Sequence, residues 1–500
     1  MRIRLDRNGA VPLYRQIERF ITEQIQNGSL VPGTRLPSNR SLAEALGISR
    51  IVVANAYAEL ESQGLVYGQR GSGTFVAPIY NTLGKSDADG ALHTDWPVWQ
   101  QELLSHAWQA GHVELDRLLA SAIRPGMISF AERINPDRLW QMADLRKSFQ
   151  AVMRSNGEVL GLGNNNFAGY YPLRETIAQI LTTEGISTHP QEVLITSGSQ
   201  QALNLVSRVL LKPGDLVLVE SPTYNVAIDL FRSMDVRLVG IPVDDQGMQT
   251  ERVEQVLQST PPRLIYTMPT FHNPTGVCLN GNRRRQLISL ADRYNIPILE
   301  DDYIGNMRYE GRIEPALKVL DPGGRVIYAA TFSKLLMPSL RVGFLVASGP
   351  VFERLVIAKY INDLNTSDLL QKALREFITV GKYHSHLRRV SQAYRERRDV
   401  MLEALAKHMP QTSWNIPRGG GYIWLTLPDD LSTDEYFHFA AEEGVTFVPG
   451  SFFYPGQRAQ SNLRLNYAIV EPDEIWEGVR RLQTAFIHFT KKKGTHIHEQ

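Results

Sequence analysis

Between residues 193 and 347 the sequence alternates short apolar runs with longer segments of helical spacing. The runs are VLIT (193–196), LVLVE (216–220), RLIYTM (263–268), IPILE (296–300), RVIYAA (325–330) and VGFLVA (342–347). Strands that alternate with helices in this way build a mostly parallel sheet. No other feature of the chain constrains the fold as strongly, and it predicts an α/β domain.

A different pattern follows after about residue 375. An arginine-rich helical stretch (387–408) precedes two strand-like segments, GGGYIWLTL and LRLNYA. This order favours a smaller α+β lobe near the C-terminal end. At about 150 residues per domain, a chain of 500 residues is expected to form roughly three lobes, and no internal repeat is evident.

The first 78 residues have a third pattern, with helical apolar spacing and then two short strands. The expected helices are 11–27, 39–46 and 49–63, and the expected strands are 65–67 and 74–76. Three helices followed by a two-stranded wing form a winged helix-turn-helix. The multidomain fold predicted is therefore this mostly α domain, then the α/β domain with its small α+β lobe.

A polar segment without periodicity, residues 79–95, separates these parts and reads as a flexible linker. Residues 96–126 regain apolar spacing, and we expect a helical arm there. The predicted domains are 1–78 and 96–500, joined by the linker.

Charge and composition narrow the possible classes of protein. Lys and Arg number 53 against 52 Asp and Glu, whereas residues 1–78 hold nine arginines, no lysine and six acids. That local excess of +3 is compatible with a nucleic-acid partner without being specific for one. The single cysteine, Cys278, excludes an intramolecular disulfide. With a polar N-terminus and no long apolar window, we expect a cytoplasmic protein without a membrane span or a signal peptide.

The helix over 49–63 has the properties of a DNA-recognition helix. Its apolar positions share one side at helical spacing: Val53, Ala56, Tyr57 and Leu60. Arg50 is left on the other side near the helix start, where a guanidinium can read guanine in the major groove. Ser49 can cap the helix and meet a phosphate. Arg35 and Arg40 flank the preceding helix and are expected to grip phosphates.

The stretch PGTRLPSNRSLAEALGISRIVVANAYAELESQGLVYGQRGSGTFV resembles the DNA-binding domain of the GntR family of bacterial regulators, over residues 11–76. The resemblance implies that this domain binds double-stranded DNA. The family's DNA-contacting positions fall on Arg35, Ser38, Arg40, Ser49, Arg50, Gly71 and Gly73. One departure is that Ile51 and Val52 stand where the family often has a polar residue and then Thr, so the operator preference is expected to differ.

Polar groups follow two of the predicted strands in a way that suits a phosphorylated cofactor. Residues 197–200 (Ser-Gly-Ser-Gln) lie between a strand and a helix, so backbone N–H groups and the helix dipole can bind a phosphate. Lys334 follows another strand, beside Ser333 and seven residues before Arg341. A lysine in such surroundings can form a Schiff base next to a phosphate site.

A cofactor that withdraws electrons through a pyridine ring needs further contacts. A carboxylate must keep the ring nitrogen protonated, and Asp301 or, by spacing alone, Asp302 can supply it. Asn273 and Tyr303 can hydrogen-bond a phenolic oxygen on the ring. Tyr224 can stack on the ring.

The ordered segments GYYPLRE, TSGSQQAL, ESPTY, HNPTG, EDDY, SK-x6-R and NLRLNYA make residues 125–485 similar to fold-type I pyridoxal-phosphate enzymes of the aspartate aminotransferase kind. The resemblance implies that pyridoxal 5′-phosphate is the cofactor and that Lys334 forms the internal aldimine. It also implies that Asp301 pairs with the ring nitrogen.

The same resemblance assigns the remaining site residues. Asn273 and Tyr303 would contact the phenolic oxygen, and Arg464 matches the arginine that clamps the α-carboxylate of a substrate. The expected phosphate ligands are Ser199, Gln200, Ser333 and Arg341. Four departures from the family put substrate scope in doubt: Ile304, Gly305, Leu335 and Ser339. No metal site is expected.

A GntR-type domain followed by an aminotransferase-like domain is the architecture of the MocR subfamily, and the similarity covers nearly the whole chain. It implies a head-to-tail, domain-swapped homodimer, an operator with two half-sites, and sensing of the cofactor or of an amino compound that attacks its aldimine. The alternative is a working aminotransferase that carries a DNA-binding domain. We favour the regulator, because a complete DNA-reading helix and wing has no role in transamination.

Overall fold

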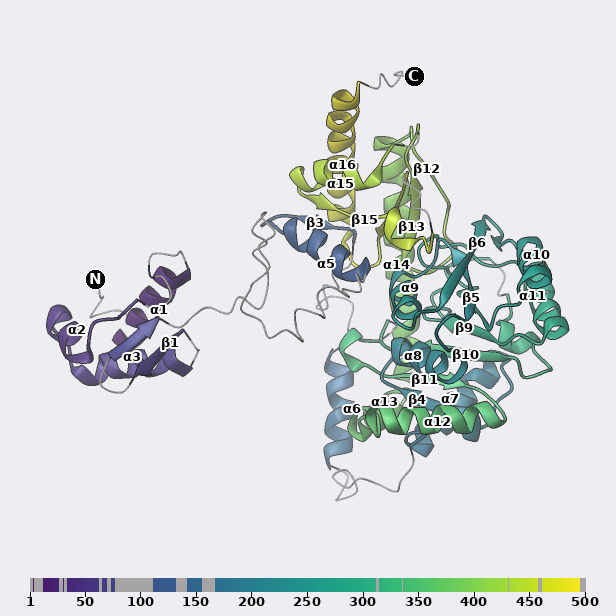
Figure 1. Cartoon of the computed structure of the whole chain (residues 1–500), viewed down its shortest axis with the longest axis horizontal. Helices are drawn as coiled ribbons and strands as arrows, with labels where there is room; N and C mark the ends of the chain where they lie inside the picture. The colour runs from purple at the N-terminus through teal and green to yellow at the C-terminus, as the bar shows by residue number, and fades with distance from the viewer. Residues whose placement is uncertain are drawn as a thin grey trace. The chain divides into compact units, whose positions relative to one another are not determined.

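The computed structural model forms two compact units, Met1–His106 and Ala107–Gln500, which we call the N-terminal unit and the C-terminal unit. The colours of Figure 1 follow the chain from purple to yellow. The structure describes residues 3, 12–26, 30, 34–62, 65–69, 73–76, 111–131, 142–154, 167–311, 314–334, 336–429, 431–456 and 461–494. The predicted linker, 79–95, lies outside them, so the predicted domain boundaries stay predictions.

Within its described residues, the N-terminal unit has three helices and a two-stranded antiparallel sheet. They are α1 (Leu13–Gln26), α2 (Asn39–Leu46), α3 (Arg50–Ser62), β1 (Val66–Gln69) and β2 (Gly73–Val76). Tyr67 of β1 lies opposite Phe75 of β2. The apolar sides of the helices meet in one core around Ile17, Leu42 and Val53, which are essentially fully buried. The predicted winged helix-turn-helix is confirmed.

An eight-stranded sheet forms the centre of the C-terminal unit. In spatial order its strands are β4 (Val193–Thr196), β11 (Gly343–Val346), β10 (Val326–Thr331), β9 (Ile298–Asp302), β8 (Leu264–Thr267), β5 (Leu216–Ser221), β6 (Arg237–Asp244) and β7 (Gly247–Met248). Neighbours from β10 through β6 are parallel, whereas β11 is antiparallel to both β4 and β10. Each predicted apolar run overlaps one of these strands, and the parallel pairing from β10 through β6 confirms the mostly parallel sheet.

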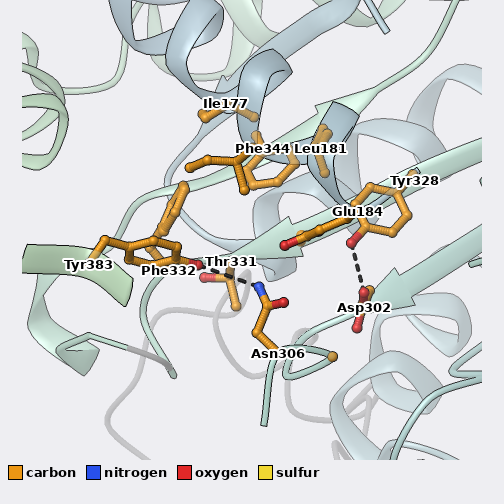
Figure 2. A pocket seen from close by; sticks show the side chains of 13 residues that line it. Ile177, Leu181, Glu184, Asp302, Asn306, Tyr328, Thr331, Phe332, Phe344 and Tyr383 are labelled. Atoms are coloured by element: carbon orange, nitrogen blue, oxygen red, sulfur yellow. Dashed lines mark hydrogen bonds between the residues drawn. The ribbon is translucent and has the colours of Figure 1, made fainter. Parts of the chain in front are cut away.

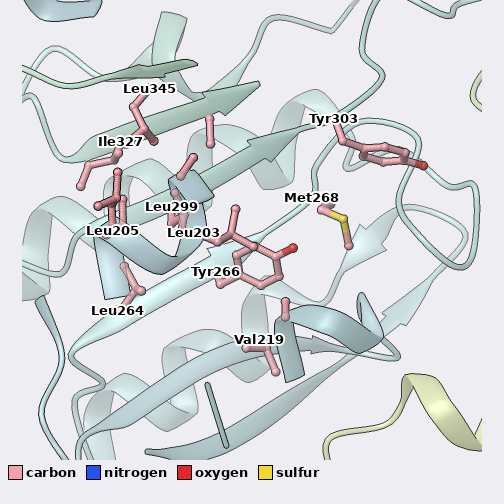
Figure 3. Packing of buried hydrophobic residues seen from close by; sticks show 14 of the residues in the cluster. Leu203, Leu205, Val219, Leu264, Tyr266, Met268, Leu299, Tyr303, Ile327 and Leu345 are labelled. Atoms are coloured by element: carbon pink, nitrogen blue, oxygen red, sulfur yellow. The ribbon is translucent and has the colours of Figure 1, made fainter. Parts of the chain in front are cut away.

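Helices cover both faces of this sheet. They are α6 (Met142–Arg154), α7 (Tyr171–Thr183), α8 (Ser199–Leu210), α9 (Asn225–Arg232), α10 (Thr250–Ser259), α11 (Gly281–Tyr294), α12 (Pro350–Asp363) and α13 (Asp368–Thr379). Figure 3 shows Leu203 of α8 near Leu264 and Leu299 of the sheet, all in one buried cluster. Consecutive residues of a strand point to opposite faces. On β10, Ile327 therefore packs in this same cluster, whereas Tyr328 packs on the opposite face with residues of α7 and α13.

A smaller lobe follows the sheet, as predicted. Its elements are α14 (Lys382–His408), β12 (Ser413–Trp414), β13 (Tyr422–Thr426), α15 (Thr433–Glu442), β14 (Val445–Thr446), β15 (Val448–Pro449), β16 (Asn462–Asn466) and α16 (Pro472–Lys493), with β3 (Ile128–Ser129) paired to β14. Four of its strands form a sheet in the order β12-β13-β16-β15. The long helix α14 joins the two parts, because Val390 lies in the core of the large sheet and Met401 in that of the lobe.

The expected helical arm over 96–126 is described only in part. Helix α5 (Gly111–Ser121) lies within that range, and residues 96–110 lie outside the described residues. The short 3-10 helices are η1 (Pro190–Glu192), η2 (Leu317–Leu320), η3 (Pro338–Leu340) and η4 (Gly450–Phe453). In the described part of the chain, no helix has the length and apolar character needed to cross a membrane.

Candidate functional site: a cofactor pocket and a nucleic-acid interface

The carboxyl end of β9 places Asp301 in the interior of the C-terminal unit, where the residue is 2% exposed. Its Oδ2 accepts a hydrogen bond of 3.0 Å from the hydroxyl of Tyr266 on β8. Its Oδ1 is buried and has no hydrogen-bond partner among the described residues. Burial raises the pKa of Asp301 to about 7, and the Tyr266 hydrogen bond opposes this rise. An open carboxylate oxygen here suits a cationic N–H donor.

The neighbouring Asp302, the alternative that spacing alone left open, faces the other side of the sheet. Its Oδ2 accepts a hydrogen bond of 2.7 Å from Tyr328, and it lines a pocket with Glu184 and Asn306 (Figure 2). Consecutive residues of a strand point to opposite faces. Asp301 therefore shares its face with Leu299, which packs in the α8 cluster. Of the two carboxylates, Asp301 lies on the face that carries α8.

Strand β16 places Arg464 beside Asn273, and the Nη1 of Arg464 donates a hydrogen bond of 2.9 Å to the Asn273 Oδ1. The guanidinium is buried and lies 4.3 Å from the ring centroid of Tyr422 and 4.9 Å from that of Phe453. Aromatic faces stabilise a buried cation. This contact uses the acceptor oxygen of Asn273 and leaves the N–H groups of its amide to donate to a ligand. The structure thus joins two residues that the sequence assigned to one site.

The two predicted tyrosines differ in their surroundings. The Tyr303 hydroxyl donates a hydrogen bond of 2.9 Å to the backbone carbonyl of Phe271. The Tyr303 hydroxyl has a single proton. To donate it to the phenolic oxygen of a cofactor, the hydroxyl would have to give up its hydrogen bond to Phe271. Tyr224 immediately precedes α9, is half-buried and packs against the core that contains Tyr266. The contacts of Tyr303 and Tyr224 with a cofactor ring stay predictions.

The turn between β4 and α8 has the geometry of an anion site. Helix α8 begins at Ser199, two residues earlier than expected, directly after Gly198, whose φ is +109°. A Cβ at Gly198 would lie 2.9 Å from Nη2 of Arg341. That nitrogen also donates a hydrogen bond of 3.0 Å to the backbone oxygen of Ser197. The guanidinium and the first N–H groups of α8 are therefore neighbours, as a phosphate site requires.

The segment after β10 supplies further polar groups. Lys334 lies in a turn and its side chain is exposed. Among the expected phosphate ligands, the Oγ of Ser333 and, at the start of α8, the Oε1 of Gln200 are buried without a hydrogen-bond partner in the described structure. The backbone N–H of Ser333 is held by the hydroxyl of Thr331, at 3.1 Å. The bond between Lys334 and a cofactor stays a prediction.

These groups fit the four polar parts of pyridoxal 5′-phosphate, which are the ring nitrogen, the phenolic oxygen, the phosphate and the aldehyde. The open oxygen of Asp301 suits the ring nitrogen, the amide of Asn273 suits the phenolic oxygen, and the start of α8 with Arg341 suits the phosphate. Lys334 supplies the amine that an aldehyde needs.

Sequence reasoning did not find Tyr266, Tyr422 or Phe453. Tyr266 lies within an apolar strand, where a tyrosine is expected to belong to the core. Its position two residues from the end of the run was a usable signal, because the ends of parallel strands face the site. Tyr422 and Phe453 come from separate segments of the small lobe, and nothing in their local sequence indicates a shared cation.

In the N-terminal unit, two serines stand at the starts of α2 and α3. Ser38 caps α2, since its side chain accepts a hydrogen bond of 3.1 Å from the N–H of Ser41. The Ser49 hydroxyl accepts one of 3.2 Å from the N–H of Ile51. Arg50 is the first residue of α3, and the side chains of Ser38, Ser49 and Arg50 are all exposed. All three can therefore reach a ligand on this surface.

The other predicted DNA contacts lie nearby. Arg35 forms an isolated bridge with Phe75 of the wing, and a Cβ at Gly73 would lie 3.0 Å from the Arg35 Nε. Gly73 has φ +119°, so its lack of a side chain serves both the backbone and Arg35. Arg40 is exposed and donates a hydrogen bond of 2.9 Å to Glu44. Gly71 lies outside the described residues.

Two family models match the chain. Residues 13–76 match the bacterial regulatory proteins of the gntR family, and residues 135–482 match the class I and II aminotransferases. The second match covers more than half of the chain. Proteins of that aminotransferase family depend on pyridoxal phosphate, which is therefore the cofactor of this fold.

Relatives and solved structures agree with both matches. The probable rhizopine catabolism regulatory protein MocR of Rhizobium meliloti is 31% identical over 97% of this chain and 95% of its own length. The regulator TauR of Rhodobacter capsulatus is 32% identical over 95% of this chain and 97% of its own length. The kynurenine aminotransferase structure from Pyrococcus horikoshii has a TM-score of 0.71 and 37% identity, over 75% of this chain and 94% of that one.

The N-terminal unit has the fold of the GntR DNA-binding domain, and the C-terminal unit has that of a fold-type I aminotransferase. Relatives named as regulators match across the junction of the two, whereas the solved aminotransferase structures cover only about three quarters of the chain. The chain therefore belongs to the MocR subfamily of GntR-type transcription regulators, in which a DNA-binding domain is joined to an aminotransferase-like domain.

Proposed function

We propose that the C-terminal unit senses pyridoxal phosphate itself, or an amino compound that reacts with it, and thereby controls DNA binding by the N-terminal unit. The cofactor supplies an aldehyde that bonds to amines and a ring that withdraws electrons. The contact between Arg464 and Asn273 carries this proposal. Arg464 is a buried cation that suits the carboxylate of an amino acid, and Asn273 suits the phenolic oxygen of the cofactor ring. An amino acid bonded to the cofactor would therefore reach Arg464 with its carboxylate.

Each site residue has a proposed role. Lys334 bonds to the aldehyde, and Asp301 holds a proton on the ring nitrogen through its open oxygen. Arg464 binds the carboxylate of an amino-acid effector through charge-assisted hydrogen bonds. The remaining contacts are those to the phenolic oxygen (Asn273, Tyr303), to the ring face (Tyr224) and to the phosphate (Ser199, Gln200, Ser333, Arg341).

In the N-terminal unit, we assign base reading to Arg50, because it begins the recognition helix with its side chain exposed. The groups assigned to phosphates are Arg35, Ser38, Arg40 and Ser49, and Gly71 and Gly73 are assigned to the approach of the wing. Arg40 must leave Glu44 to reach a phosphate, and both side chains are largely exposed, so this exchange is inexpensive.

The assembly we propose is a head-to-tail homodimer in the cytoplasm, with an operator of two half-sites. A row of exposed apolar side chains near the end of α12 supports association: Ile357, Ile361 and Leu364 are 52%, 77% and 63% exposed. Large apolar side chains exposed at helical spacing in this way are typical of interaction sites. The linker, 79–95, would let each N-terminal unit cross to the partner chain.

A second candidate function is amino-group transfer, which the combination of a lysine, a ring-nitrogen carboxylate and a carboxylate-binding arginine favours. Footprinting on the DNA upstream of the protein's own gene, with and without pyridoxal phosphate and a panel of amino acids, separates the two. The proposal expects protection that changes with the cofactor or an effector, and a loss of that change in Lys334→Ala. Rapid amino-group transfer without any change in protection would overturn the sensing proposal and favour the enzyme.

A further inference from the structure

The backbone of Ser197, at the start of the anion-binding turn, is held from two sides. Its N–H donates a hydrogen bond of 2.7 Å to the side-chain oxygen of Gln201. Its carbonyl accepts one of 3.0 Å from Arg341. Arg341 is a proposed phosphate ligand. Gln201 is not, because both the oxygen and the nitrogen of its side-chain amide form hydrogen bonds within the protein.

The other end of the Gln201 amide leads to an ion pair on α12, in which the lysine is buried and the side chain of Asp363 is 23% exposed. Its Nε2 donates a hydrogen bond of 2.8 Å to the Asp363 Oδ2. Both oxygens of Asp363 also accept hydrogen bonds of 2.8 Å from the ammonium of Lys359, whose side chain is 0% exposed. Helix α12 packs against α8, so this chain of contacts joins two neighbouring helices.

The ion pair is poorly explained by stability alone. Burial lowers the pKa of Lys359, and the contact with Asp363 opposes this. Removing a charge from water costs much of what a buried ion pair gains, and apolar side chains of similar volume often stabilise a protein as well or better. A positional role is the alternative explanation, and the path to Ser197 supplies one.

We propose that Lys359 and Asp363 are positioning residues that hold the phosphate-binding turn through Gln201. A carboxylate only accepts hydrogen bonds. Asp363 therefore fixes the amide of Gln201 with its nitrogen toward α12 and its oxygen toward the N–H of Ser197. This orients the peptides that follow, at the start of α8. The inference rests on the proposed role of Ser199 and Gln200 as phosphate ligands.

Asp363→Asn is the sharpest change, because it keeps the shape of the side chain and adds a donor. The amide of Gln201 can then turn over, which would set its NH2 group against the N–H of Ser197. Lys359→Met combined with Asp363→Leu removes the pair without leaving a buried charge, and this double variant is expected to fold even if a single variant does not.

The control is a second lysine–aspartate pair of the same unit. Lys318 and Asp321 lie 3.8 Å apart with side chains that are 10% and 2% exposed. The ammonium of Lys318 donates to the carbonyl of Val326, at the start of β10. No hydrogen bond described in the structure joins Lys318 to α8 or to the turn at Ser197. Lys318→Met therefore removes a buried charge of the same kind at a place that cannot orient the turn.

The experiment measures the affinity of the full-length protein for pyridoxal phosphate and for pyridoxal, which lacks the phosphate, by tryptophan fluorescence titration. Asp363→Asn and the double variant should weaken pyridoxal phosphate on the order of tenfold, the loss of about one hydrogen bond to a charged group. Pyridoxal should change less than about twofold, and Lys318→Met should leave the ratio of the two affinities unchanged.

If the ratio of the affinities for pyridoxal phosphate and pyridoxal is unchanged in both variants, whether both ligands weaken equally or neither weakens, the positioning role is overturned. Failure of the proposed function has a different signature. In that case the wild-type protein itself would bind pyridoxal phosphate no more tightly than pyridoxal, and Lys334→Ala would not alter either affinity.

Discussion

Arg464 and Asn273 are 191 positions apart in the chain, and Nη1 of Arg464 donates a hydrogen bond of 2.9 Å to Oδ1 of Asn273. This contact joins the small lobe to the loop that follows β8. It also fixes which way the amide of Asn273 faces, because its oxygen is used by the guanidinium. A ligand carboxylate at Arg464 would therefore lie close to a ring contact of the cofactor.

Arg464→Ala is expected to weaken the binding of an amino-acid effector and to leave the covalent attachment of the cofactor to Lys334 in place. Each charge-assisted hydrogen bond contributes roughly 1.5–3 kcal/mol, so effector affinity should fall about tenfold or more. Titration of the visible absorption band with effector measures this. Amines without a carboxylate are the control and should bind both proteins alike. If such amines lose as much affinity as amino acids, Arg464 has a structural role.

Lys334→Ala is expected to abolish covalent attachment of the cofactor. Wild-type protein with pyridoxal phosphate should show a visible absorption band, and borohydride reduction should fix the label on a single peptide. Some cofactor should remain bound to the variant through the phosphate contacts. Lys212→Ala, at an exposed position, should retain the band and the labelled peptide. A wild-type label on another lysine would contradict the assignment.

Asp301 gives the cofactor-free protein a specific pH dependence. Because its pKa is raised to about 7 in the folded state, the folded protein holds this proton more tightly than the unfolded chain. The extra stability is complete below the pKa of an ordinary aspartate and is lost as the pH rises through about 7.

In Asp301→Asn, this part of the pH dependence should be missing between about pH 4 and 8. One unit of pKa corresponds to about 1.4 kcal/mol, which denaturant unfolding at a series of pH values can resolve. Asp116→Asn, on the exposed side of α5, is the control. Identical slopes in wild type and Asp301→Asn would show that the pKa of Asp301 is not raised in the folded protein.

Arg50 and Arg40 should respond differently to removal. Arg50→Ala should lose about 1–3 kcal/mol on the cognate site and little on random DNA, because a base contact carries specificity. Arg40→Ala should weaken both DNAs alike and lower the salt dependence of binding by about one unit. Titrations of cognate and scrambled duplexes at several salt concentrations measure both effects. A wild-type protein without preference between the duplexes would contradict sequence-specific binding.

The sequence alone determined most of the architecture. Continuous apolar runs such as 263–268 identify buried strands, and helical spacing in 49–63 identifies a recognition helix whose buried side is now observed at Val53 and Leu60. These inferences succeed because burial imposes a period on the sequence that is readable over a few residues. Nothing equally local distinguishes an antiparallel strand, so the run that forms β11 has the same pattern as the runs that form the parallel strands.

The choice between adjacent carboxylates depended on the tertiary structure. Asp301 and Asp302 are equivalent by spacing, but the pleat of β9 turns them to opposite faces, and only the packing of α8 shows which face carries the anion site. Contacts between distant segments, such as Gln201 with Asp363, follow from helix packing and leave no local pattern, so only the fold could place them.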